Sequence, residues 1–177
     1  MIINKSILDL DIGALSRYLG EKLLIFGNIP YHITSPILFQ ILENYQYIDA
    51  IALLTQKEVA LRLTASPRTK DYGIPTVLLG NYFDISILFD VPPKAFKPAP
   101  AVDSSFFTMI PREKPIYSGN HDLFAKIVRA AFAQRRKMIR KSLKEFINDR
   151  ADVPFLTARP EELTIEDFGI LTDALSK

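Results

Sequence analysis

Four short apolar runs in the first two thirds of the chain have the length and composition of β-strands. They span residues 23–26, 48–55, 83–91 and 104–110. Apolar residues at helical spacing fill the stretches between the first three runs, at 35–45, 58–65 and 76–82. Strands that alternate with helices predict an α/β fold with a largely parallel sheet.

The last two strand-like runs have no helix between them. They are joined by the segment VPPKAFKPAPAVDS, which contains four prolines. Each proline fixes its φ angle and cannot donate a backbone hydrogen bond, so the segment favours a stiff, extended loop. We therefore predict an antiparallel strand pair with this loop at its mouth.

The pattern becomes helical after Ser118-Gly119-Asn120, whose composition is typical of a turn. We expect one long helix from about His121 to Phe146, followed by short helices near 155–157 and 160–175. The sequence thus predicts two domains, with residues 1–118 forming the α/β part and residues 119–177 a small all-helical part.

Composition removes several classes of protein. The 177 residues include no cysteine and only two histidines, which excludes disulfide scaffolds and thiolate nucleophiles and argues against a metal site. No apolar run approaches the roughly 18 residues that a membrane helix needs. The N-terminus also lacks a secretory pattern. We expect a cytoplasmic protein without membrane contact.

The net charge of +2 hides an uneven distribution. Residues 120–150 contain nine Lys or Arg and three acidic residues, whereas the rest of the chain carries an excess of acids. A basic segment on an acidic body indicates a localised anionic partner.

The stretch FGNIPYHITSP, residues 26–36, follows a purely apolar strand and is the strongest candidate for a site. The Asn28 side chain and the Ile29 carbonyl, with the backbone fixed by Pro30, can accept both N–H bonds of one amine. That arrangement turns the nitrogen lone pair out of conjugation with an aromatic ring, and Tyr31 offers a face on which such a ring can stack. The chemistry fits methylation of a base amine by orientation alone. The alternative is a plain strand-to-helix turn.

Five segments together carry a family resemblance. They are GNIPYHITSPILF, LTQKEVALRL, KDYGIPTVLL, VPPKAFKPAPAVDSS and AFAQRRKMIRKSL. In this order they resemble the ribosomal RNA adenine N6-dimethyltransferases, in particular the small-subunit type, over about residues 3–174. The resemblance implies the C-terminal half of a Rossmann-like methyltransferase sheet followed by a small all-helical, rRNA-binding domain.

The resemblance implies an S-adenosylmethionine-dependent enzyme that dimethylates N6 of two adjacent adenines near the 3′ end of small-subunit rRNA, within a 30S-type particle. It assigns the target amine to Asn28 and Ile29, and the flipped adenine to Tyr31, with Phe96 as a second aromatic wall. Asn28 would also lie against the methionine end of the cofactor. An apolar plug of the loop is the alternative for Phe96.

Six basic residues are predicted to contact RNA phosphates: Arg135, Arg136, Lys137, Arg140, Lys141 and Lys144. On one continuous helix, Arg136, Arg140 and Lys144 would share a face. A merely solvated basic face is the alternative, but the neighbouring stacking site and the charge contrast favour phosphate contact.

A glycine-rich cofactor loop is absent from the sequence, since no two of its seven glycines are closer than seven residues. In the family this loop precedes the present segment, and an acid that contacts the cofactor adenine aligns with Ser6. We therefore expect a fragment with an incomplete cofactor site, inactive alone. The strand at 23–26 should then have an open edge, covered by the N-terminal segment or by another chain in a dimer or swapped contact.

Two other functions stay open. The large-subunit rRNA methyltransferases that confer macrolide resistance share Asn-Ile-Pro-Tyr, although Val102-Asp103-Ser104 and Gln134-Arg135-Arg136-Lys137 favour the small-subunit type. A non-catalytic RNA-binding or ribosome-assembly factor is the role that remains if the chain does not bind the cofactor.

Overall fold

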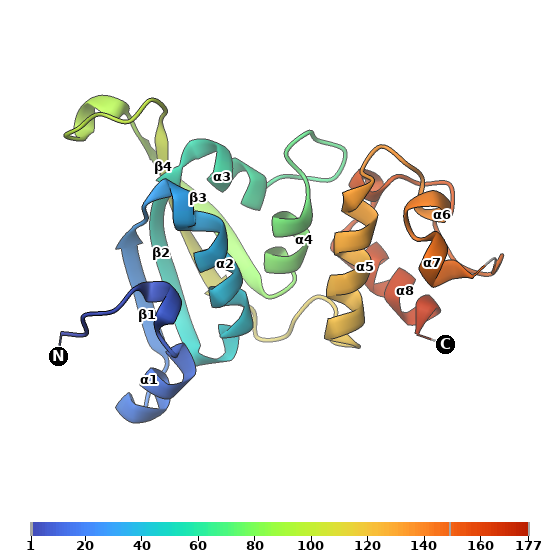
Figure 1. Ribbon diagram of the computed structural model, residues 1–177, viewed down its shortest axis with the longest axis horizontal. Helices are drawn as coiled ribbons and strands as arrows, with labels where there is room; N and C mark the ends of the chain where they lie inside the picture. The colour runs from blue at the N-terminus through green and yellow to red at the C-terminus, as the bar shows by residue number, and fades with distance from the viewer. Residues whose placement is uncertain (1, 149, 177) are drawn as a thin grey trace. The chain divides into compact units, whose positions relative to one another are not determined.

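The computed structural model describes residues 2–148 and 150–176, and the chain divides into two compact units (Figure 1). One unit comprises Met1–Leu61 and Tyr82–Arg112, and the other comprises Arg62–Asn81 and Glu113–Lys177. Residues 62–81 therefore cluster with the C-terminal helices, which the sequence did not indicate. The assignment of domains to 1–118 and 119–177 itself stays a prediction.

A four-stranded sheet forms the centre of the first unit. Its strands are β1 (Leu23–Asn28), β2 (Ile48–Gln56), β3 (Phe83–Val91) and β4 (Ser104–Pro111), in the order β1-β2-β4-β3. All four predicted strands are present, within two residues at each end, and the predicted antiparallel pairing of the last two is confirmed. The α/β fold class is confirmed as well.

The prediction of a largely parallel sheet is wrong. Only β1 and β2 pair in parallel, whereas β4 is antiparallel to both β2 and β3. The physical reason is that β4 returns from the loop after β3 and inserts between β2 and β3. Strands β1, β2 and β3 still run in one direction, as their helical connections require, but β2 and β3 are not neighbours.

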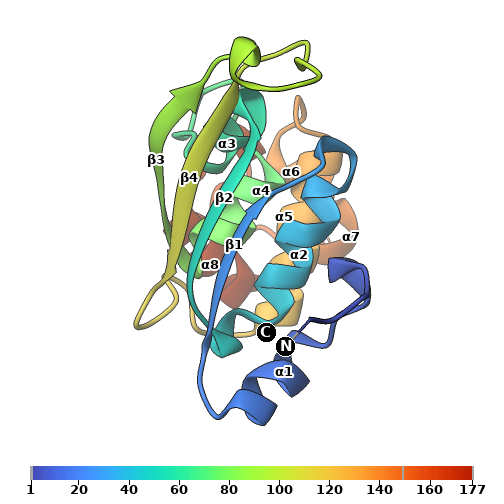
Figure 2. The same cartoon turned by 90° about the vertical axis from the view of Figure 1, so that its left-hand side faces the viewer.

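This unit also contains helices, and the one at 34–43 covers a face of the sheet. They are η1 (Ile7–Asp9), α1 (Ile12–Leu19), η2 (Tyr31–Ile33), α2 (Thr34–Glu43), η3 (Tyr45–Tyr47), the start of α3 (Lys57–Leu63) and η4 (Pro93–Ala95). Figure 2 shows α2 alongside β1 and β2, and the loop between β3 and β4 at the end of the sheet. The α2 side chains Ile37, Leu38 and Ile41 are buried there, as is Ile51 of β2.

The opposite face of the sheet is apolar and accessible in the described chain. Leu24 and Phe26 of β1 are 74% and 79% exposed, and Phe89 of β3 is 55% exposed. Phe106 of β4 lies between the two phenylalanines, with ring centroids 5.9 Å from Phe26 and 5.1 Å from Phe89. Strand β1 is an edge of the sheet, as predicted. The predicted cover for that edge stays a prediction.

The second unit is helical. Its elements are α4 (Ile74–Gly80), α5 (His121–Ala133), α6 (Ile139–Ser142), α7 (Lys144–Ile147), η5 (Pro160–Glu162) and α8 (Ile165–Leu175). Phe124 and Ile127 of α5 and Phe168 of α8 are fully buried. The Tyr117 ring stacks on Phe124 at 5.1 Å, and the backbone of Tyr117 is bonded to the buried Asn81 side chain.

The long helix predicted for 121–146 is wrong. Helix α5 ends at Ala133, residues 134–138 form a turn and bend, and two short helices follow. The Ile139 N–H donates to the Ala158 carbonyl and the Arg140 N–H to the Leu156 carbonyl, at 2.8 and 3.0 Å. These long-range bonds replace the helical bonds that a continuous helix would make. A helix near 155–157 is also absent, since the chain forms turns there.

Candidate functional site

The motif Asn28-Ile29-Pro30-Tyr31 lies at the carboxyl end of the parallel strand pair. Asn28 is the last residue of β1, and the Ile29 N–H donates to the Leu54 carbonyl of β2 at 3.0 Å. The chain then turns through η2 into α2. Ligands of open α/β sheets bind at this end of the strands. The motif therefore occupies a position where a ligand can reach it.

A buried bond between two threonines fixes the turn that carries the motif. The Thr34 hydroxyl, at the start of α2, lies 3.1 Å from the Thr55 hydroxyl near the end of β2. Both side chains are buried. Since a buried hydroxyl without a partner is costly, this pair favours one position of α2 relative to β2.

A hollow of about 280 Å³ opens at the motif. Its walls are Asn28, Ile29, Pro30, Tyr31, Phe96, Pro98 and Pro100. The first four come from the β1–α2 connection and the other three from the loop between β3 and β4. The five residues that the sequence analysis assigned to the target base thus lie around one hollow, although their catalytic roles stay predictions.

Two hydrogen-bond acceptors of the motif are available to a ligand. The Asn28 side chain is exposed, and within the described chain neither its amide nor the Ile29 carbonyl makes a hydrogen bond. Ile29 as a whole residue is only 5% exposed, so its buried side chain anchors the backbone that carries this carbonyl. Two unused acceptors on one rigid segment suit an amine donor.

Tyr31 has a partner that sequence reasoning missed. Its phenol oxygen lies 2.8 Å from the hydroxyl of Ser104, the first residue of β4, which is fully buried. The next residue, Ser105, donates to Asp90 of β3 at 2.6 Å. The sequence contained these serines within the quoted loop segment, but nothing local shows which residue each one contacts.

An exposed ion pair lies on the other side of the same loop. The Lys57 ammonium is 2.5 Å from Asp90, and this hydrogen bond raises the pKa of Lys57. The bonds from Lys57 and Ser105 lower the pKa of Asp90, so both groups are charged near neutral pH. The backbone carbonyl of Asp103 accepts the Lys57 backbone N–H at 3.0 Å.

Ser6, the predicted cofactor residue, is exposed and caps η1. Its hydroxyl accepts the Leu8 N–H at 3.3 Å. Ser6 is not among the residues that line the hollow at the motif, and its cofactor role stays a prediction.

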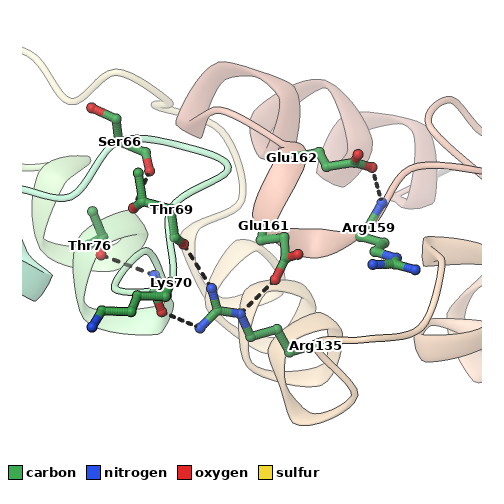
Figure 3. A network of polar contacts seen from close by, with 9 residues as sticks. Ser66, Thr69, Lys70, Thr76, Arg135, Arg159, Glu161 and Glu162 are labelled. Carbon is green, nitrogen blue, oxygen red and sulfur yellow. Dashed lines mark hydrogen bonds and ion pairs between the residues drawn. The ribbon is translucent and has the colours of Figure 1, made fainter.

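Arg135 is held by three hydrogen bonds inside the helical unit (Figure 3). Its guanidinium donates to the Glu161 carboxylate at 2.7 Å, to the Lys70 carbonyl at 2.5 Å and to the Thr69 carbonyl at 2.8 Å. These bonds join the turn after α5 to η5 and to the segment before α4. Because the donors already have partners, Arg135 is a poorer candidate for phosphate contact than its neighbours.

The other predicted RNA contacts are exposed but do not form one helical stripe. Arg136 and Lys137 lie in the turn, Arg140 and Lys141 on α6, and Lys144 at the start of α7. The shared face predicted for Arg136, Arg140 and Lys144 is therefore wrong, because the helix that would create it is broken.

The basic residues border two hollows instead. One, of about 630 Å³, is lined by Arg140, Lys141, Lys144, Ile147, Arg150, Ala151 and Leu156. The other, of about 340 Å³, is lined by residues 132–137. Arg150, absent from the predicted set, forms an ion pair with Asp152 at 2.8 Å. A phosphate chain would meet several cations at the larger hollow.

Residues 2–148 and 150–176 contain neither a cluster of metal-ligating side chains nor a helix that could cross a bilayer. No group of three or more metal-ligating side chains occurs in that part of the chain. None of the helices described there is long and apolar enough to span a bilayer.

Two structures of known proteins share this fold. A dimethyladenosine transferase from Plasmodium falciparum superposes with a TM-score of 0.72 at 23% identity, over 84% of this chain and 64% of that one. The 23S rRNA methyltransferase ErmE superposes with a TM-score of 0.67 at 26% identity, over 99% of this chain and 71% of that one.

Sequence comparison gives closer relatives. The ribosomal RNA small subunit methyltransferase A of Chlorobium phaeobacteroides is 46% identical over 156 residues, and that of Francisella tularensis subsp. novicida is 36% identical over 180 residues. The matches cover 87% and 99% of this chain but 58% and 69% of those proteins. The family model for ribosomal RNA adenine dimethylase matches residues 1–164. The chain therefore belongs to the ribosomal RNA adenine dimethylase family, and it spans about three fifths of the length of several curated relatives.

Proposed function

We propose that this chain is the target-base and RNA-binding part of an S-adenosylmethionine-dependent methyltransferase. Its substrate is a pair of adjacent adenines near the 3′ end of small-subunit rRNA, dimethylated at N6 within a 30S-type particle in the cytoplasm. The observation that carries the proposal is the hollow at the motif, where two aromatic rings and two unused acceptors converge.

Base extrusion is the first step. Removing an adenine from its stack costs a few kcal/mol. Stacking on an aromatic side chain returns about 1–3 kcal/mol per ring. Tyr31 and Phe96 come from different connections and border the same hollow, so an adenine between them would regain most of what extrusion costs.

Amine orientation is the second step. The adenine amine is conjugated with its ring, so its lone pair is a poor nucleophile until the N–H bonds are turned. Hydrogen bonds to the Asn28 side-chain oxygen and the Ile29 carbonyl would hold both N–H groups and expose the lone pair. They would also stabilise the positive charge that develops on N6. The released proton goes to water, and no general base is required.

The residues described here fit only part of a cofactor site. When bound, S-adenosylmethionine supplies a methyl group on a positively charged sulfur. By the family resemblance Asn28 would lie against its methionine end, and Ser6 offers a neutral hydroxyl where that resemblance implies an acid. We propose weak cofactor binding by this chain alone, and therefore little methyl transfer.

RNA contact is assigned to the exposed cations Arg136, Lys137, Arg140, Lys141 and Lys144. Lysine and arginine that neutralise phosphates release counterions, so each contact makes binding weaken more steeply with salt. The larger hollow would let Arg140, Lys141 and Lys144 act on one stretch of backbone.

The test measures RNA affinity by fluorescence anisotropy with two oligonucleotides. One has the two adjacent adenines in a small-subunit 3′-end hairpin, and the other has abasic sites at the same positions. Both adenines lie in the unpaired loop of the hairpin, where extrusion costs least, so we expect stacking to make binding of the first tighter by about five- to a hundredfold. Tyr31→Ala should reduce this difference, because only Phe96 then remains to stack on the base. Equal affinity of the unmodified chain for both oligonucleotides would overturn the proposal. A preference for the matching large-subunit hairpin would favour the macrolide-resistance type.

A further inference from the structure

We infer that Ser104 is a positioning residue that holds the Tyr31 ring in the orientation needed to stack on the target base. The inference rests on the proposed function, which gives Tyr31 its stacking role. It adds a residue outside the motif and outside the walls of the hollow. The contact that carries it is the 2.8 Å hydrogen bond between the two hydroxyl groups.

The two partners differ in how firmly the fold holds them. Tyr31 begins the single turn of η2 and is partly exposed. Ser104 is fully buried, and its strand is interior to the sheet, opposite Gln56 of β2 on one side and Val91 of β3 on the other. Ser104 is therefore the fixed partner, and the bond restrains the ring of a residue on a short turn.

The hydrogen bond between Tyr31 and Ser104 also links the two segments that form the walls of the hollow. Tyr31 belongs to the β1–α2 connection, and Phe96 belongs to the loop that ends where β4 begins at Ser104. A link between Tyr31 and Ser104 thus ties one wall to the end of the segment that carries the other. A buried serine hydroxyl has no water to replace a lost partner, so the bonded arrangement is favoured over a rotated ring.

Ser105 provides a matched control within the same strand. It is also fully buried, and its hydroxyl is also committed to one side chain, Asp90. Successive residues of a strand point to opposite faces, so this bond does not involve Tyr31. Ser105→Ala removes the same atom from an equally buried position while leaving the Tyr31 contact intact.

The experiment uses the affinity ratio for the adenine and abasic oligonucleotides. Partial unfolding lowers the active fraction for both RNAs alike, so the ratio reports the base site rather than stability. We expect Ser104→Ala and Tyr31→Phe each to reduce the ratio by about two- to tenfold, the range expected from one hydrogen bond. The double variant should lose no more than either single one, because both changes remove the same bond. Ser105→Ala should keep the ratio.

The outcomes distinguish a failure of this inference from a failure of the proposed function on which it rests. If the unmodified chain shows no preference for adenine, the proposed function fails and the inference with it. If the preference is present but Tyr31→Phe retains it in full, only the inference fails. Tyr31→Phe keeps the aromatic ring and changes a partly exposed position, so this variant should fold. Its affinity ratio therefore tests the inference even if Ser104→Ala folds poorly. Additive losses in the double variant would also overturn the shared bond.

Discussion

Arg135 was predicted to bind RNA, yet its contacts suit a role in holding the helical unit together. We predict that Arg135→Ala destabilises this unit while changing RNA binding little. The side chain donates to Glu161 and to two backbone carbonyls, those of Thr69 and Lys70. The substitution removes all three bonds at once and leaves the turn after α5 attached to fewer neighbours.

The magnitude follows from the exposure of the partners. Arg135 and Glu161 are 35% and 28% exposed in their side chains, so the ion pair is screened and contributes about 0.5 kcal/mol. The two bonds to backbone carbonyls contribute about 1 kcal/mol each. The expected loss in unfolding free energy is therefore about 2–3 kcal/mol. Arg135→Lys should recover little of it, because an ammonium cannot reproduce the planar fork.

Urea unfolding followed by circular dichroism measures this loss, with Arg136→Ala as the matched control. Arg136 is the adjacent residue and is exposed, so its truncation should change stability by less than about 0.5 kcal/mol. In RNA titrations at several salt concentrations, Arg136→Ala should have the larger effect of the two variants. Arg136→Ala should reduce the slope of log affinity against log salt by about 0.7–0.9, and Arg135→Ala should leave it nearly unchanged. Equal stabilities of the two variants would refute the structural role of Arg135.

Three further predictions concern single features. In a version extended to the length of the relatives, Tyr31→Ala should abolish methyl transfer while calorimetry still detects cofactor binding; a fully active variant would contradict the stacking role. Replacing Arg140 and Lys144 by Ala should flatten the salt dependence of RNA affinity by about 1.5 in slope, and an unchanged slope would mean a merely solvated surface. Tyr72 donates to the Leu163 carbonyl at 2.8 Å, and Tyr72→Phe should cost about 1 kcal/mol in unfolding free energy. Burial raises the pKa of Tyr72 above its value in the unfolded chain. Its contribution to the unfolding free energy is therefore complete below about pH 10 and is lost as pH rises further. Unfolding curves measured at alkaline pH should show this loss in the unmodified protein and not in Tyr72→Phe.

The strands and the motif could be predicted because their signals are local. Apolar runs bounded by Gly, Pro and Asn specify strands without help from distant residues. The position of β4 within the sheet is different, since its insertion between β2 and β3 depends on which strand edges are available after the chain has folded. The alternation of strands with helices predicted the directions of the strands correctly, but it did not predict which strands lie next to each other in the sheet.

The helical unit was harder to predict, because long-range bonds override local preference there. The spacing of Phe132, Ile139, Leu143 and Phe146 fits one helix as well as it fits the observed pieces. The Ile139 N–H instead donates to the carbonyl of Ala158, nineteen residues on, and no local pattern indicates that bond. The role of Arg135 and the partner of Tyr31 belong to the same class, since each depends on a residue far along the sequence.

The break in the helix after α5 changes the shape of ligand that the basic residues can contact. A continuous helix over 121–146 would be about 39 Å long and would place Arg136, Arg140 and Lys144 on one face. In the observed arrangement the cations lie on a turn and two short helices, and Arg140, Lys141 and Lys144 line a concave surface. A bent nucleic-acid strand bound in that concavity would be contacted by cations on several sides. The affinity would then depend on the curvature of the strand as well as on its charge.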